Sequence, residues 1–339
     1  MVMVSPVDDY ILPRRARGRP SAAGEIEYRE KVGGLCALIL QIRSTMDFTV
    51  GSRGWCYILE RHGLRKGDFD AAQRLINDCR KSGDLPLEIC DEDASRATIG
   101  LEDVSRTSVD DEVESWRNTL HNHAHEQYTP FSFWNKIDVY VEVAVEKLDL
   151  RNLFESVCTE FCVPITNFKG WSDLNSRAAM MRRFKFWETR DKRVVLLLCG
   201  DHDPGGLHIT EKLRKNFEDL AAAVGWSPKN LVISRFGLNA DFIDRHGLTW
   251  IDNLETSSGG QLDDPDHDDH DKRYVQDYIR VFGVRKCEAN ALVVEPQLGR
   301  RLCRGAVLRF IPADAATRHQ RRLKQARLRL RRALRSLVS

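Results

Sequence analysis

The sequence predicts an α/β protein in which a small helical module precedes a parallel sheet. The run VVLLLC at residues 194–199 is apolar throughout, which is typical of a parallel strand buried on both faces. Strand and helix patterns alternate from residue 138 onward, and this alternation favours a parallel sheet with crossover helices. Before residue 84, three segments show helical rather than strand periodicity.

A winged-helix domain is predicted over residues 24–95. A long helix is followed by two shorter ones, the second ended by Gly63 and the third running from the N-cap Asp68 to Gly83. The segment LPLEIC, residues 85–90, has the composition of a strand. Three helices followed by a strand make a winged helix, whose third helix can enter the major groove of DNA. Candidate DNA contacts on that helix are Arg74, Arg80 and Lys81, although a solvated helix face explains them equally well.

The remaining segments complete the expected domain order. Residues 96–135 form a helical linker, with one helix from Ser108 to His125, and residues 136–312 form the α/β domain. An Arg-rich helix follows at 313–339; it could bind DNA phosphates or cover a partner's surface. Within the α/β domain we expect strands at 138–145, 163–170, 194–199 and 230–237, and helices at 148–161 and 207–225.

Composition and charge narrow the class of partner. An apolar fraction of 42% and a charged fraction of 30% are ordinary for a globular protein, and no apolar run approaches the roughly 20 residues that span a bilayer. The net charge of +2 hides basic ends, PRRARGRP and RRLKQARLRLRRALR, around an acidic run, DDPDHDDHD. Basic ends on a nearly neutral body indicate that the partner is an anionic polymer, and they favour nucleic acid over a membrane. We therefore expect a cytoplasmic, nucleoid-associated protein.

Two further features concern the tail and the cysteines. Residues 1–23 are predicted to be a disordered basic tail, in which Arg17 and Arg19 of RGRP resemble the core of an AT-hook; a generic basic tail is the alternative.

The nine cysteines are isolated except for Cys158 and Cys162, and no second pair completes a zinc site. We interpret them as reduced and structural.

Carboxylates follow two of the predicted strands. Glu146 ends one strand, and Asp201 and Asp203 follow another. Because ligands of open α/β sheets bind beyond the carboxyl ends of the strands, these three side chains are candidate Mg²⁺ ligands. An EF-hand is disfavoured because Lys212 stands where the bidentate Glu belongs, and a haloacid dehalogenase because Gly205 replaces Thr or Val. A purely structural acidic turn stays open.

These residues carry a family resemblance. Glu146-Lys147 at a strand end, followed by Asp201-His202-Asp203-Pro204-Gly205-Gly206, resembles the Toprim domain of type IIB topoisomerase A subunits and of the related enzyme that makes meiotic double-strand breaks. FGLNADFID (236–244) and KCEANAL (286–292) are similar to later blocks of that family. The resemblance covers about residues 30–300. It is strongest to the stand-alone Mini-A type, which is associated with mobile elements and lacks a companion ATPase.

The winged-helix segment adds to the resemblance. The family's nucleophilic tyrosine follows an arginine by four residues, and Arg53 and Tyr57 match those positions. Gly54 replaces a common acid and Cys56 a common second tyrosine, which puts the local electrostatics in doubt. Without the family, Tyr57 is more simply an aromatic residue of the core.

The resemblance implies a function. Tyr57 would attack a DNA phosphate to give a 5′-phosphotyrosyl link, with Arg53 and Mg²⁺ stabilising the charge and Lys147 and Glu288 supporting the site. In the family the tyrosine works with the metal site of its partner, so a homodimer cutting both strands is expected. The sequence has no P-loop, so an ATPase would be a separate subunit. A hydrolytic Toprim nuclease and a non-catalytic DNA-binding regulator are the alternatives.

Overall fold

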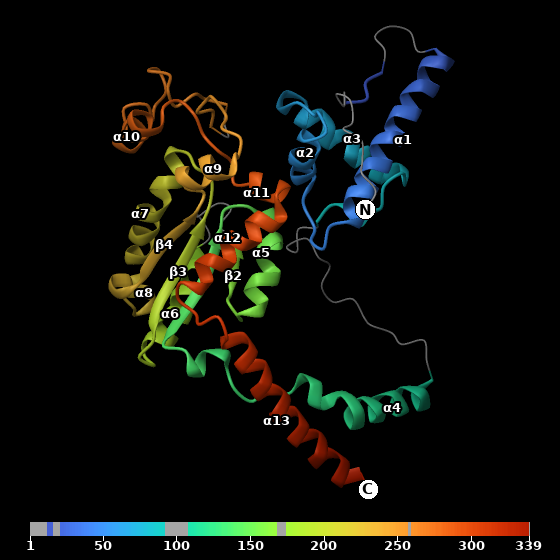
Figure 1. The fold of residues 1–339 in the computed structure, drawn as a ribbon, viewed down its shortest axis with the longest axis vertical. Helices are drawn as coiled ribbons and strands as arrows, with labels where there is room; N and C mark the ends of the chain where they lie inside the picture. The colour runs from blue at the N-terminus through green and yellow to red at the C-terminus, as the bar shows by residue number, and fades with distance from the viewer. Residues whose placement is uncertain (1–11, 16–20, 92–107, 168–173, 257–258, 339) are drawn as a thin grey trace.

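The computed structural model describes residues 12–15, 21–91, 108–167, 174–256 and 259–338. A group of N-terminal helices packs beside an α/β body, and two helices extend away from the body as an arm that ends at the C-terminus (Figure 1). One continuous hydrophobic core joins the helical group to the body. None of the described helices is both long and apolar enough to cross a membrane.

The N-terminal group contains the three expected helices. They are α1 (Ala22–Ser44), α2 (Ser52–Glu60) and α3 (Phe69–Ser82). Gly83 ends α3 in the left-handed conformation at φ 86°, as its position after the last apolar residue predicts. Asp68 precedes α3 but makes no capping hydrogen bond, because its carboxylate pairs with Arg14 instead.

The predicted strand at residues 85–90 is wrong. This segment forms a 3-10 helix, Leu87–Ile89, and the described residues of 21–91 contain no β-strand. Pro86 removes one backbone donor, and Arg80 donates two hydrogen bonds to the Leu87 carbonyl, at 3.0 and 2.7 Å. The backbone is thus satisfied locally, without a neighbouring strand.

Packing also holds part of the predicted tail. Leu12 is buried in the main core, and Arg15 donates to the carboxylate of Glu25 on α1 at 3.1 Å. Residues 12–15 are therefore ordered against the helical group, and α1 begins at Ala22, inside the range assigned to the tail. The AT-hook-like residues Arg17 and Arg19 lie outside the described residues.

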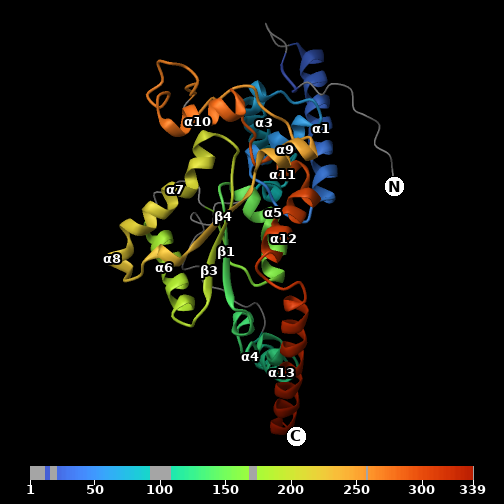
Figure 2. The same cartoon turned by 60° about the vertical axis from the view of Figure 1, so that its left-hand side comes forward.

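The α/β body confirms the predicted fold class. Its four strands are all parallel and lie in the order β2-β1-β3-β4; they are β1 (Val139–Val145), β2 (Ile165–Asn167), β3 (Arg193–Cys199) and β4 (Val232–Gly237). Helices cover both faces of the sheet (Figures 1 and 2). On one face lie α5 (Leu148–Glu160) and α12 (Pro296–Leu308), and on the other α6 (Leu174–Glu188) and α7 (Pro204–Asp219).

Shorter helices complete the body, namely α8 (Ala221–Val224), α9 (Ala240–His246), α10 (Arg273–Phe282) and α11 (Ala291–Val294). The expected helix at 207–225 is divided between α7 and α8 and begins earlier than expected, at Pro204. Near the carboxyl edge of the sheet, α10 packs on α7 (Figure 2). A separate small apolar cluster lies there, made of Leu254, Leu262, Val275 and Tyr278.

The arm consists of α4 (Val109–Asn118) and α13 (Ala315–Val338). The expected helix from Ser108 to His125 is present, but it changes to a π-helix at Thr119–His123 and to a 3-10 helix at Ala124–Gln127. A further 3-10 turn, Phe133–Lys136, leads from this segment into β1.

Polar contacts fix the helical group to the body. The Asp149 carboxylate of α5 accepts a hydrogen bond from the Gly51 amide at 2.8 Å, and the Asn152 amide donates to the Thr49 carbonyl at 3.0 Å. Gly54 on α2 also faces Asp149, and a Cβ at this position would lie 2.4 Å from an Asp149 carboxylate oxygen. This contact leaves no room for a side chain at position 54.

Candidate active site

The carboxylates predicted from the strand ends lie together. β1 and β3 are neighbours in register, with Val145 opposite Cys199, so the residues that follow them meet at one edge of the sheet. The Glu146 amide donates to the Cys199 carbonyl at 3.1 Å, and the Glu146 carboxylate accepts from the Asp201 amide at 3.0 Å. Parallel pairing therefore brings Glu146 to the loop that carries the two aspartates.

An arginine that the sequence did not single out holds this loop in place. Arg235, on β4, donates to the carbonyls of Gly200, Asp201 and Gly206 at 2.9, 2.6 and 2.8 Å. Burial lowers the pKa of the Arg235 guanidinium from its ordinary value, although the thiol of Cys199 and the carboxylate of Asp203 act against the shift. One buried cation thus organises the loop between β3 and α7.

Two glycines allow the chain to pass close to itself here. A Cβ at Gly206 would lie 2.2 Å from the Asp201 carbonyl oxygen, and one at Gly200 would lie 2.7 Å from a Glu146 carboxylate oxygen. Asp203 caps α7, because its side chain accepts from the Gly206 amide at 2.5 Å and Pro204 occupies the first turn. One oxygen of Asp203 therefore has a structural role, in line with the acidic turn that the sequence left open.

The ammonium group of Lys147 lies beside the acids that follow β1 and β3. Lys147 forms a 2.7 Å ion pair with Asp201. Although burial opposes the charge of Lys147, Asp201 and Glu146 hold its pKa above its ordinary value. Burial, followed by the negative charge of Asp201, raises the pKa of Glu146 to about 7 and also raises that of Asp203. The cluster carries more negative charge than Lys147 neutralises.

Tyr57 lies on α2 and faces this region. It is 5% exposed, and its hydroxyl donates to a carboxylate oxygen of Glu288. Burial, and then the charge of Glu288, raise the pKa of Tyr57 well above its ordinary value, while a hydrogen bond from Arg53 acts in the opposite direction. The ring packs edge-on against Phe69, with 5.1 Å between centroids. Arg53 and Tyr57, paired in the sequence by spacing, are therefore also in contact.

Glu288 connects the tyrosine to the sheet edge. Burial acts to raise its pKa, but the hydrogen bond from Tyr57 and the charge of Lys147 outweigh burial and hold the pKa below its ordinary value. The amide of the next residue, Ala289, donates to the Asp201 carboxylate at 2.7 Å. The tyrosine and the acids thus belong to one network within a single chain, whereas the resemblance implies a tyrosine acting on the partner's site.

A cavity of about 300 Å³ opens beside Tyr57 and Glu288. It lies between α2 of the helical group and the α9–α11 region of the body, and three basic side chains line it: Arg61, Lys66 and His246. Arg61 is paired with Glu295, which also lines the cavity. Glu60 and Glu288 line it as well, so Lys66 and His246 are the basic side chains of this lining that could contact a phosphate group beside the tyrosine hydroxyl.

His202, between the two aspartates, is structural. It is buried, its Nδ1 lies 2.9 Å from the Tyr278 hydroxyl, and its backbone pairs with that of Cys287 in the KCEANAL block. Burial, followed by the charge of Arg235, lowers the pKa of His202 to about 4, so the imidazole is neutral at neutral pH. This side chain anchors the KCEANAL segment, and with it Glu288, to the loop after β3.

The three cations predicted on α3 all make local contacts. Arg80 donates to the Leu87 carbonyl and to the Asn77 side chain, so its donors are used within the chain. Lys81 forms a 3.0 Å ion pair with Asp78, and Arg74 donates to the Asp70 carbonyl at 3.2 Å. Arg74 and Lys81 are exposed and free to exchange these contacts for others.

The chemical types of the carboxylate ligands suit Mg²⁺, but the side chains are not arranged around one point as metal ligands. Glu146, Asp201 and Asp203 supply hard oxygen ligands with excess negative charge. Among the residues that the structure describes, however, no group of three or more His, Cys, Asp or Glu side chains is arranged to hold a metal ion. Lys147 takes one oxygen of Asp201, and backbone amides take others. A cation bound to that oxygen of Asp201 would replace Lys147 as its partner.

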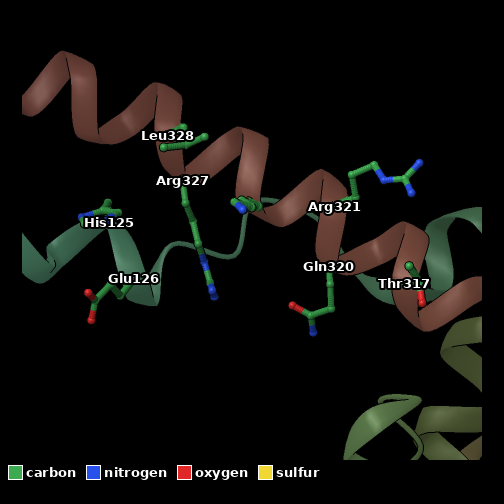
Figure 3. A pocket seen from close by; sticks show the side chains of 8 residues that line it. His125, Glu126, Thr317, Gln320, Arg321, Arg327 and Leu328 are labelled. Carbon is green, nitrogen blue, oxygen red and sulfur yellow. The ribbon is translucent and has the colours of Figure 1, made fainter.

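A larger groove, of about 680 Å³, lies in the arm between α13 and the turns that follow α4 (Figure 3). Arg327 extends from α13 to the Tyr128 carbonyl at 3.2 Å, while Arg321 points away from these turns (Figure 3). The lining has one carboxylate, Glu126, and no paired acid and base. We therefore place the candidate chemistry at the sheet edge rather than in this groove.

No protein-family model, curated protein or solved structure matches the chain. The function is therefore inferred from the residues of the site itself.

Proposed function

We propose that the protein cleaves double-stranded DNA by transesterification at Tyr57, with the three N-terminal helices in the place of a winged-helix domain and the α/β body in the place of a Toprim domain. The observation that carries the proposal is the contact between the Tyr57 hydroxyl and the Glu288 carboxylate, beside Arg53 and a cavity that both basic and acidic side chains line. A nucleophile hydrogen-bonded to an ionised acceptor is the arrangement that activation of a phenol requires. Two chains, each cutting one strand, would produce a double-strand break.

Glu288 has a more specific role in this proposal than support of the fold. Because the pKa of Tyr57 is raised, the phenol is protonated at neutral pH and needs a base. The pKa of Glu288 is lowered, so its carboxylate is ionised and can accept the proton. The Tyr57 oxygen forms a bond to phosphorus while its proton passes to Glu288, and the phosphorus–O3′ bond breaks. The departing O3′ takes a proton from water, and the proton held by Glu288 restores that water. Arg53 stabilises the negative charge that develops.

Glu146, Asp201 and Asp203 would hold Mg²⁺. The ion supplies neutralisation of phosphate charge and favours departure of the 3′ oxygen. Lys147 holds Asp201 in the absence of the ion, and Arg235 keeps the loop between β3 and α7 in the shape that presents both aspartates.

A hydrolytic nuclease is the second candidate. The near-complete burial of Tyr57 favours it, because water reaches a sheet-edge metal site more easily than a phosphodiester reaches a buried phenol. The same acids would serve, and Tyr57 would then stabilise the interface between α2 and the body.

One experiment distinguishes these functions. The protein is incubated with supercoiled plasmid and Mg²⁺, and the products are separated on a denaturing gel. Transesterification predicts covalent protein–DNA that disappears in Tyr57→Phe and persists in Tyr140→Phe. Tyr140 is a matched control, since its buried hydroxyl donates to Glu142 at 2.9 Å, away from the sheet edge. Cleavage that survives Tyr57→Phe but fails in Asp201→Asn indicates hydrolysis. Binding without cleavage leaves the non-catalytic DNA-binding regulator.

A further inference from the structure

Helix α4 lacks a covering surface among the residues that the structure describes. All ten of its residues are exposed, and α13 packs mainly against the π-helical and 3-10 turns that follow α4. Isolated helices shorter than about 12–15 residues are marginally stable in water, and most helices gain stability by burying an apolar face. A helix exposed on every side therefore indicates a surface that is completed by another molecule.

Exposed apolar residues of α4, with one from the π-helical turn Thr119–His123 that follows it, form one stripe. Val109, Val113, Trp116 and Leu120 are 79%, 53%, 64% and 57% exposed. Their spacing of four, three and four residues is that of the apolar positions in a coiled-coil heptad. Val109, Val113 and Trp116 therefore share one face of α4, and Leu120 continues the same spacing in the π-helical turn. Large apolar side chains that gather on one exposed face mark an interaction site.

The stripe is symmetric about its own midpoint. Val109 and Leu120 lie equally far from the point between Glu114 and Ser115, and so do Val113 and Trp116. An antiparallel copy of the same helix would therefore set Val109 against Leu120 and Val113 against Trp116, in four complete layers. A twofold axis through the midpoint produces this match, as an isologous interface requires.

The charges beside the stripe match in the same orientation. Asp110 and Arg117 occupy equivalent flanking positions of successive heptads, which face each other across an antiparallel pair. Each Asp110 would then lie near the partner's Arg117, a side chain that within one chain pairs with Glu114 at 2.9 Å. A parallel pair would instead bring together two acidic first turns, each containing Asp110, Asp111 and Glu112. The same acidic turn repels nucleic acid, so DNA is not the partner of this face.

We propose that α4 and the first residues of the π-helical turn after it pair with the same segment of a second copy of this chain, in an antiparallel, twofold-symmetric contact through Val109, Val113, Trp116 and Leu120. A contact made by one short helix from each chain falls below the roughly 1,000 Å² expected of a stable interface. The dimer is therefore reversible and depends on protein concentration. The inference is independent of the cleavage chemistry, because it uses no residue of the sheet edge.

Sedimentation equilibrium of the full chain, without DNA, tests the contact. The wild-type chain should show a monomer–dimer equilibrium, and Val113→Ser should weaken it roughly tenfold or more, as loss of a central interface side chain does. Val281→Ser is the matched control, because Val281 is a similarly exposed valine (63%) on α10, and it should leave the equilibrium unchanged. α4 packs on no core, so these variants should keep the wild-type circular dichroism.

Charge reversal tests the orientation. Asp110→Arg and Arg117→Asp should each weaken self-association, because each homodimer then opposes like charges. A mixture of the two variants should restore dimers, since both ion pairs of the heterodimer are attractive. A wild-type chain that stays monomeric at all concentrations would overturn the proposal. So would a dimer that Val113→Ser leaves unchanged, or a mixture that associates no better than either variant alone.

Discussion

Replacing Arg235 by Met removes the cation that holds the loop between β3 and α7. Three carbonyl oxygens, those of Gly200, Asp201 and Gly206, then lose a donor that lies 2.6–2.9 Å away. Hydrogen bonds to charged groups contribute about 1.5–3 kcal/mol each, and burial of the guanidinium opposes part of that gain. We expect Arg235→Met to lower the free energy of unfolding by about 3–5 kcal/mol.

Urea denaturation followed by circular dichroism measures this loss. Arg214→Met is a matched control, because Arg214 donates to the Pro228 and Leu231 carbonyls at 3.0 and 2.9 Å, in a similar arrangement. Both variants should be destabilised, but only Arg235→Met should also weaken Mg²⁺ binding, measured by calorimetry. A loss of stability below about 1 kcal/mol, or equal effects of both variants on Mg²⁺ binding, would refute the reasoning.

Three further predictions concern the contact between the helical group and the body, the lysine beside the acids, and a histidine of the arm. Gly54→Ala should cost about 1–3 kcal/mol in urea denaturation, because the new Cβ would meet Asp149; no loss would contradict the packing described here. Lys147→Met should destabilise the Mg²⁺-free protein by about 2 kcal/mol, because Asp201 loses its ion-pair partner. Mg²⁺ should raise the melting temperature of this variant more than that of wild type, since Lys147 no longer competes with the ion for Asp201. An equal rise in both proteins would contradict this competition. Burial lowers the pKa of His319 from its ordinary value of 6.5, so the unfolded chain binds the proton more readily and stability should fall as pH drops through 6.5 toward the folded value. Melting temperatures of wild type and His319→Gln between neutral and mildly acidic pH test this, and equal pH dependence in both would contradict it.

The sequence was sufficient where the pattern is local. β1 and β3 follow from apolar runs, and Glu146, Asp201 and Asp203 follow from the rule that parallel strands end at one edge. The start of α7 could also have been predicted, because an Asp directly before a Pro is a common helix start.

Residues defined by distant contacts could not be predicted in this way. Arg235 reaches carbonyls 29–35 positions earlier in the chain, and Tyr57 meets Glu288 across 231 positions. No periodicity encodes such pairs. α6 gave no clear pattern because Arg and Lys alternate with Met and Phe, and only packing on the sheet selects its buried face, which includes Met180, Met181 and Phe184. The false strand at 85–90 had strand composition but no neighbouring strand to pair with.

The covalent bond to Tyr57 is the most direct test of the proposed chemistry. Duplex DNA labelled at its 3′ or 5′ ends is incubated with the protein and Mg²⁺, denatured and separated by size. We predict that only the 3′-end label migrates with the protein, that Tyr57→Phe abolishes the transfer, and that Glu288→Gln slows it about 10²–10⁴-fold, as loss of a general base does. Transfer of label to Tyr57→Phe, or cleavage that leaves both labels free of protein, would contradict the account.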